Sequence, residues 1–143
     1  MIILSLPCAL GFNILSGVNP LGNIGGDCTN FVSQCIYEGS KVMNHTKTFG
    51  WYYYSANKKS PSWTGVEYLF NFLTKNSGIG PYGNVCSKED IEQGDIIQLS
   101  FDGDNFAHSL FVVDKVLSNI WIATHTFDAY YKNLNDYNYQ KIR

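Results

Sequence analysis

The chain has 143 residues, 45% of them hydrophobic, and this length suits one domain with a sizeable core. The formal net charge is -2, so no basic field is present and we do not expect nucleic acid as a partner. Four cysteines at irregular spacing, without a C-x-x-C pair, argue against a zinc ribbon and against a dense disulfide framework.

The chain opens with an apolar run followed by a loop. Residues 1–12 (MIILSLPCALGF) have the length of a signal-peptide core but lack a charged n-region and a clear cleavage site. We expect a helix or an extended segment packed on the core, with a processed secretion signal as the alternative. The run is too short to span a membrane. Residues 13–26 are rich in Gly, Asn and Pro, which predicts a loop.

A helix with a cysteine in its first turn comes next, in the sequence GGDCTNFVSQC of residues 25–35. Apolar spacing predicts the helix from about Thr29 to Glu38, with Asp27 as N-cap and Gly39 as C-cap. The positive end of the helix dipole favours the thiolate of Cys28, which is the nucleophilic form of a cysteine. Cys35 lies about 10.5 Å further along the axis, too far for a disulfide, and is expected in the core.

The remaining elements change from helix to strand. A second helix is expected over 64–76, capped by the Ser-Pro-Ser sequence of residues 60–62, because its apolar residues share one face. Alternating residues between Gly- and Asn-containing turns predict strands at 96–100, 107–116 and 121–126, and a short one near 137–142. Helices followed by an antiparallel sheet are typical of an α+β fold.

Two histidines are candidates for the base that a cysteine nucleophile needs. His108 opens an apolar strand beside a Gly-rich turn, and His125 lies near the end of the next strand. With a two-residue turn at 118–119, His125 pairs opposite Val112, so both histidines would face the same side of the sheet, about 13 Å apart along the strand. A bulge, or a turn centred nearer 116–117, would close that gap.

Several motifs carry a resemblance to a known family: GGDCTNFVSQC (25–35), WYY (51–53), SPSW (60–63), GDIIQ (94–98), HS (108–109) and ATHT (123–126). Together they resemble the bacterial putative amidase domain family, in the expected order and over about residues 22–143. More distantly, DCTNFV is similar to the Asp-Cys-Ser-Gly-Phe-Val motif of NlpC-like cell-wall peptidases. Residues 1–21 do not match the Tyr- and Ala-rich helical segment usual in the family, so we expect a divergent or truncated N-terminal segment before a domain spanning 22–143.

The resemblance implies a papain-like, NlpC-like cysteine peptidase fold, with N-terminal helices packed on a C-terminal antiparallel sheet. It implies a triad of Cys28 as nucleophile, His108 as base and His125 as the residue that orients the base. The implied activity is a cysteine-dependent amidase or peptidase acting on an amide or peptide bond of a cell-wall peptide or a related substrate. It needs neither cofactor nor metal, and a secreted or cell-envelope location would suit such a substrate.

Substrate contacts are expected from Asp27, Trp51, Tyr52 and Trp63, with core packing as the alternative for at least half of the aromatic candidates. Two other functions stay open. One is a non-catalytic module that binds a peptide or glycan on the same fold. The other is a metal site formed by Cys28, His108 and His125, which are suitable ligands but lack the short spacing of metal-binding motifs.

Overall fold

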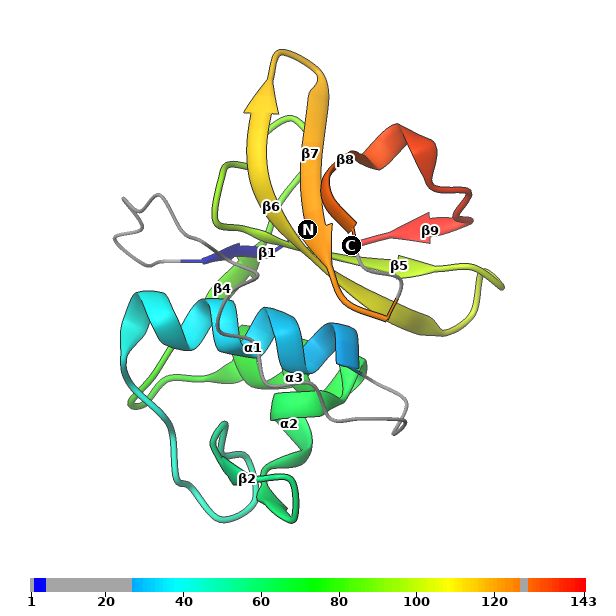
Figure 1. The fold of residues 1–143 in the computed structure, drawn as a ribbon. Helices are drawn as coiled ribbons and strands as arrows, with labels where there is room; N and C mark the ends of the chain where they lie inside the picture. Colours follow the sequence, from blue (N-terminus) through cyan, green and yellow to red (C-terminus); the bar gives the residue numbers. More distant parts are fainter. Residues whose placement is uncertain (1, 5–26, 127–128) are drawn as a thin grey trace.

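The protein is described by a computed structural model for residues 2–4, 27–126 and 129–143. Three helices, α1 (Asp27–Ser40), α2 (Pro61–Thr64) and α3 (Val66–Lys75), pack on one side of an antiparallel sheet (Figure 1). The expected mixed α+β class with an antiparallel sheet is therefore confirmed.

Within the described residues, seven strands form the main sheet in the order β4-β1-β5-β6-β7-β8, and β9 also pairs with β5. Their bounds are β1 (Ile2–Leu4), β4 (Gly83–Val85), β5 (Ile96–Ser100), β6 (Phe106–Val116), β7 (Asn119–Thr124), β8 (Ala129–Asn133) and β9 (Lys141–Ile142). A separate hairpin of β2 (Tyr53–Ser55) and β3 (Lys58–Lys59) precedes α2, and a 3-10 helix, η1 (Leu134–Asp136), follows β8.

The start of the chain contributes a strand to this sheet. β1 pairs antiparallel with β4 and meets β5 at Ile96, which agrees with the expected extended segment. The rest of the apolar run and the loop expected at 13–26 lie outside the described residues.

The helical layer differs from the prediction at several boundaries. α1 begins at Asp27 itself and continues through Gly39, so the expected N-cap at Asp27 and C-cap at Gly39 are both wrong. Lys41 takes the latter role: its φ is 54°, and its amide donates to the carbonyl of Tyr37 at 2.7 Å, as in an αL cap. The helix expected over 64–76 begins two residues later, at Val66, because Gly65 is extended, and a separate short helix, α2, forms where only a cap was expected.

The β6–β7 hairpin has a different register from the predicted one. Val116 pairs with Asn119, so the turn lies at 117–118, and the register shifts by one residue between Val112 and Asp114. This bulge gives β6 an extra residue relative to β7. Because side chains alternate along a strand, one extra residue moves the following part of β7 to the other face relative to β6.

The register shift separates the two strand histidines. His108 is opposite Leu99, which belongs to the hydrophobic cluster on the face of the sheet away from α1. The His125 ring instead stacks on Phe31 of α1. The prediction that both histidines face the same side is therefore wrong, and the bulge is the physical reason.

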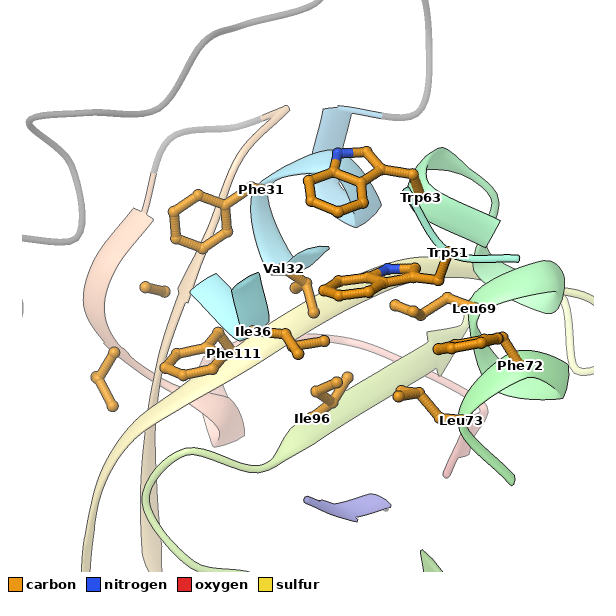
Figure 2. Close-up of a cluster of buried hydrophobic side chains, with 12 residues drawn as sticks. Phe31, Val32, Ile36, Trp51, Trp63, Leu69, Phe72, Leu73, Ile96 and Phe111 are labelled. Atoms are coloured by element: carbon orange, nitrogen blue, oxygen red, sulfur yellow. The ribbon is translucent and has the colours of Figure 1, made fainter. Parts of the chain in front are cut away.

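Two hydrophobic clusters lie on the two faces of the sheet. The first packs between the helices and the sheet and is shown in Figure 2; its largest fully buried members are Phe31, Ile36, Trp51, Trp63, Leu69, Leu73 and Ile96. The second fills the other face and consists of Ile91, Ile97, Leu99, Leu110, Val112, Ile120, Ile122 and Leu134. Cys35 packs partly buried against the first cluster, as expected for a core cysteine.

Candidate active site

Cys28 lies in the first turn of α1, where the unpaired backbone amides and the helix dipole favour a negative charge. Its side chain is 3% exposed, and its Sγ lies 3.8 Å from the hydroxyl of Thr29. The Thr29 hydroxyl is in turn 2.9 Å from the hydroxyl of Ser109 on β6. This contact fixes the cysteine end of α1 against the sheet.

Asp27 and His125 form a close pair at the same end of the helix. Nδ1 of His125 is 2.8 Å from Oδ2 of Asp27, and both side chains are largely buried. The second carboxylate oxygen of Asp27 accepts a hydrogen bond from the Asn30 side-chain amide at 3.0 Å. The carboxylate therefore has one oxygen directed to the helix and one to the segment after β7.

The His125 ring covers the part of α1 that carries the cysteine. It stacks on Phe31 with ring centroids 5.3 Å apart and planes 6° from parallel. Phe31 is three residues after Cys28 and four after Asp27, and residues at these spacings are neighbours on a helix surface. The structure therefore places His125 against Asp27 and Phe31, on the same turn of α1 that carries Cys28.

The described contacts of His108, on β6, are with residues other than Asp27 and Cys28. Its side chain is 7% exposed, its Nε2 is 3.3 Å from the Thr124 hydroxyl, and its ring is near those of Phe101 and Tyr137. Burial lowers the pKa of His108, so the neutral ring is favoured. The next residue, Ser109, points to α1, because adjacent side chains of a strand face opposite ways. The structure does not group His108 with Asp27 and His125.

The aromatic candidates for substrate contact divide into core and surface. Trp51 and Trp63 are 0% and 1% exposed and stack on each other inside the first cluster (Figure 2), so core packing, the alternative left open by the sequence, describes both. Tyr52 is half-buried, and its ring lies beside those of His45 and Tyr54.

Sequence reasoning missed two polar side chains of the site, Thr29 and Asn30. Both are buried, and both hold groups next to Cys28 in place. A signal was present in the sequence, because the polar residues at 29, 30 and 33 are interspersed with the apolar residues that α1 buries. Buried polar side chains normally have hydrogen-bond partners, so such a helix face indicates a polar network.

Three other features bear on function. Among residues 2–4, 27–126 and 129–143, no group of three His, Cys, Asp or Glu side chains is placed to hold a metal ion. In the same part of the chain, no helix combines the length and apolar character needed to cross a membrane. A cavity of about 440 Å³ lies between the loop after α1 and the last turns of α3. Two of the side chains that line it, Asn44 and Asn76, donate their amide hydrogens to the backbone carbonyl of Ile79.

Comparison with known proteins gives two matches. Residues 20–143 match the family described as "Putative amidase domain". The chain is also 30% identical over 110 residues to "Uncharacterized protein YhbB" of Bacillus subtilis (strain 168), an alignment that covers 75% of this chain and 35% of the relative. The chain thus spans about a third of that relative's length. No solved structure matches.

Proposed function

Because the chain belongs to the family described as "Putative amidase domain", we propose that it is a cysteine-dependent amidase with Cys28 as the nucleophile. Family membership supports amide hydrolysis. The observation that supports cysteine dependence is the position of Cys28 at the start of α1, beside the Asp27–His125 pair. The similarity to NlpC-like peptidases supports a papain-like arrangement and a cell-wall peptide or related amide as substrate.

In the proposed mechanism, His125 accepts the thiol proton of Cys28 on Nε2, and the thiolate attacks the carbonyl carbon. Asp27 holds Nδ1–H, which keeps Nε2 available and stabilises the imidazolium that forms. The backbone amide of Cys28 stabilises the oxyanion at the helix N-terminus. The imidazolium then returns its proton to the leaving amine, and water hydrolyses the thioester with His125 again as base.

The order of the motifs in the chain supports a second assignment, with His108 as the base and His125 as its orienter. The contacts of His125 with Asp27 and Phe31 favour His125, because Phe31 is a direct neighbour of Cys28 on α1. The two assignments predict different rankings of the histidine variants.

The first experiment tests the nucleophile. Cys28→Ala should abolish release of product from peptidoglycan fragments and should remove the fastest site of iodoacetamide labelling. Cys35→Ala, on the same helix, is the matched control and should keep both properties. Burial raises the pKa of Cys86, so its thiol should react slowly. Labelling of Cys28→Ala at the rate of the unmodified protein would contradict the proposal, and binding of cell walls without turnover would favour a non-catalytic module.

The same assay ranks the histidines. His125→Ala should lower kcat/KM by about 100-fold or more, the usual scale for loss of a general base, while His108→Ala should lower it less. The reverse ranking would transfer the role of base to His108.

A further inference from the structure

A chain of hydrogen bonds connects the Asp27–His125 pair to a tryptophan on another helix. The indole nitrogen of Trp63, in α2, donates to Oδ1 of Asn30 at 2.9 Å. Nδ2 of Asn30 donates to Oδ1 of Asp27 at 3.0 Å, and Oδ2 of Asp27 is 2.8 Å from Nδ1 of His125. Four side chains from α1, α2 and the segment after β7 thus form one continuous series.

The direction of this series follows from chemistry. An indole nitrogen can only donate, so the atom of Asn30 that it meets must be the oxygen. The amide nitrogen of Asn30 must then face Asp27, and a carboxylate can only accept. Nδ1 of His125 is therefore the protonated nitrogen, and in the neutral ring Nε2 carries the lone pair.

Ring packing holds the tryptophan end of this hydrogen-bonded series. Trp63 stacks on Trp51 with centroids 4.6 Å apart and on Tyr53 at 5.7 Å, within the first cluster. Asn30 is 1% exposed, so its amide meets little competition from water. In such surroundings a series of hydrogen bonds is electrostatically strong, and each member orients the next.

We infer that Asn30 and Trp63 are positioning residues, which fix the orientation and tautomer of His125 through the Asp27 carboxylate. This inference rests on the proposed function for its effect on catalysis, whereas its effect on the His125 ring is independent of any activity. It also gives α2 a role: the short helix holds the indole that sets the position of a side chain distant from it in sequence.

The test compares Trp63→Phe with Trp51→Phe. Each variant removes one indole N–H from the same buried stack, but Trp51 donates to Ser33 at 3.0 Å, outside the series. Trp63→Phe should lower kcat by about tenfold with little change in KM, as is common when a supporting partner is lost, and Trp51→Phe should change kcat less than twofold. Asn30→Asp still accepts from Trp63 but places a second carboxylate against Asp27, so it should shift the pH profile of kcat/KM to higher pH.

A second measurement does not depend on activity. Two-bond ¹H–¹⁵N NMR of the histidine rings reports which nitrogen of His125 is protonated. We expect the Nδ1–H tautomer in the unmodified protein and in Trp51→Phe, and a mixture of tautomers in Trp63→Phe and Asn30→Asp. Identical His125 signals in all four proteins would overturn the inference. Loss of activity in Trp51→Phe equal to that in Trp63→Phe would also overturn it, whereas full activity of Cys28→Ala would overturn the proposed function alone.

Discussion

At the scale of single residues, His108 should make the protein sensitive to acid. Burial lowers its pKa in the folded state, while the unfolded chain binds the proton near the ordinary value of about 6.5. Below that pH the unfolded state binds more protons than the folded state, so stability falls as pH falls. The histidine thus contributes stability above about pH 6.5 that is lost on acidification.

The prediction concerns His108→Gln, measured by thermal unfolding between pH 7.5 and pH 5. The melting temperature of the unmodified protein should fall across this range, and the variant should show a smaller fall, whatever its stability at pH 7.5. His45→Gln is the control, because that ring lies on the surface beside Tyr54. A pH dependence of His108→Gln as steep as that of the unmodified protein would contradict the assignment.

At the scale of elements, two glycines test how tightly the loops hold the helical layer. A Cβ added at Gly50 would lie 2.3 Å from the carbonyl oxygen of Thr46 and 2.7 Å from that of Asn44, and backbone atoms cannot easily move. A Cβ at Gly65 would lie 2.7 Å from Cδ2 of Tyr68, an exposed side chain that can rotate away, and 3.1 Å from the carbonyl oxygen of Pro61, a milder overlap than either at Gly50. Gly50→Ala should therefore destabilise the fold by about 2–3 kcal/mol, and Gly65→Ala by less than about 1 kcal/mol. Urea unfolding measures both, and a cost of Gly50→Ala as small as the one expected for Gly65→Ala would show that the loop around Gly50 is not tightly packed.

The elements also show what the sequence could predict. β5 begins and ends at the predicted residues, Ile96 and Ser100, and β6 differs by one residue, because Gly- and Asn-containing turns on either side bound these short apolar runs. β8 and η1 were missed, since Ala129–Asn133 has no clear alternation of apolar and polar residues. The break at Gly65 was missed because the apolar pattern of α3 continues across it.

The part of the candidate site that depends on local sequence was predictable, and the part that depends on strand register was not. The helix position of Cys28 follows from local sequence, and the structure confirms it. The environment of His125 depends on the bulge between Val112 and Asp114, which no local pattern marks. The register between strands is set by packing across the whole sheet. The face on which a strand residue lies therefore depends on residues far from it in the sequence.

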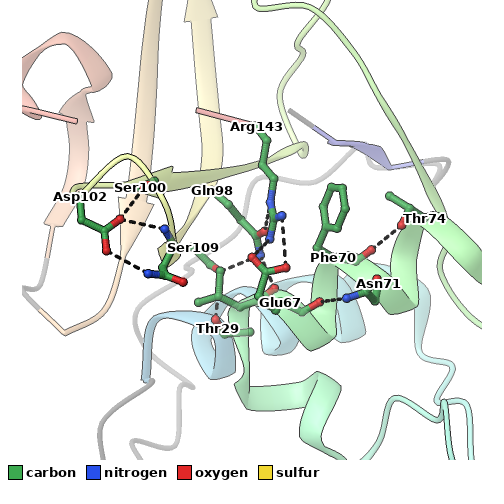
Figure 3. A network of polar contacts seen from close by, with 12 residues as sticks. Thr29, Glu67, Phe70, Asn71, Thr74, Gln98, Ser100, Asp102, Ser109 and Arg143 are labelled. Carbon is green, nitrogen blue, oxygen red and sulfur yellow. Dashed lines mark hydrogen bonds and ion pairs between the residues drawn. The ribbon is translucent and has the colours of Figure 1, made fainter. Parts of the chain in front are cut away.

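At the scale of the whole molecule, Arg143 connects the two layers. Its guanidinium bonds Glu67 of α3 at 2.8 Å and Oε1 of Gln98 on β5 at 2.9 Å (Figure 3). It also packs on the rings of Phe70 and Phe106, whose centroids lie 3.8 Å and 4.0 Å from its Cζ. Gln98 also donates to Ser109 at 3.2 Å, and Ser109 contacts Thr29 beside Cys28. The polar network thus runs from α3 through the sheet to the first turn of α1.

This arrangement predicts unequal effects of the two members of the ion pair. Arg143→Ala should destabilise the fold by about 2 kcal/mol, because it removes ring packing and the Gln98 contact together. Glu67→Gln should cost less than about 1 kcal/mol, because the Glu67 side chain is 54% exposed and solvent screens the pair. Chemical denaturation compares the two variants. Equal costs would indicate that the ion pair, rather than packing, is the main contribution of Arg143.

The bulge in β6 has a consequence for how such a site can diverge. One inserted residue separates the register observed here from the one in which His108 and His125 would share a face. We expect loss or gain of a single codon between positions 111 and 116 to exchange the two registers, because a substitution leaves the number of residues in the hairpin unchanged. Libraries of single-codon deletions and insertions across this hairpin would therefore reach arrangements of the two histidines that are closed to error-prone amplification.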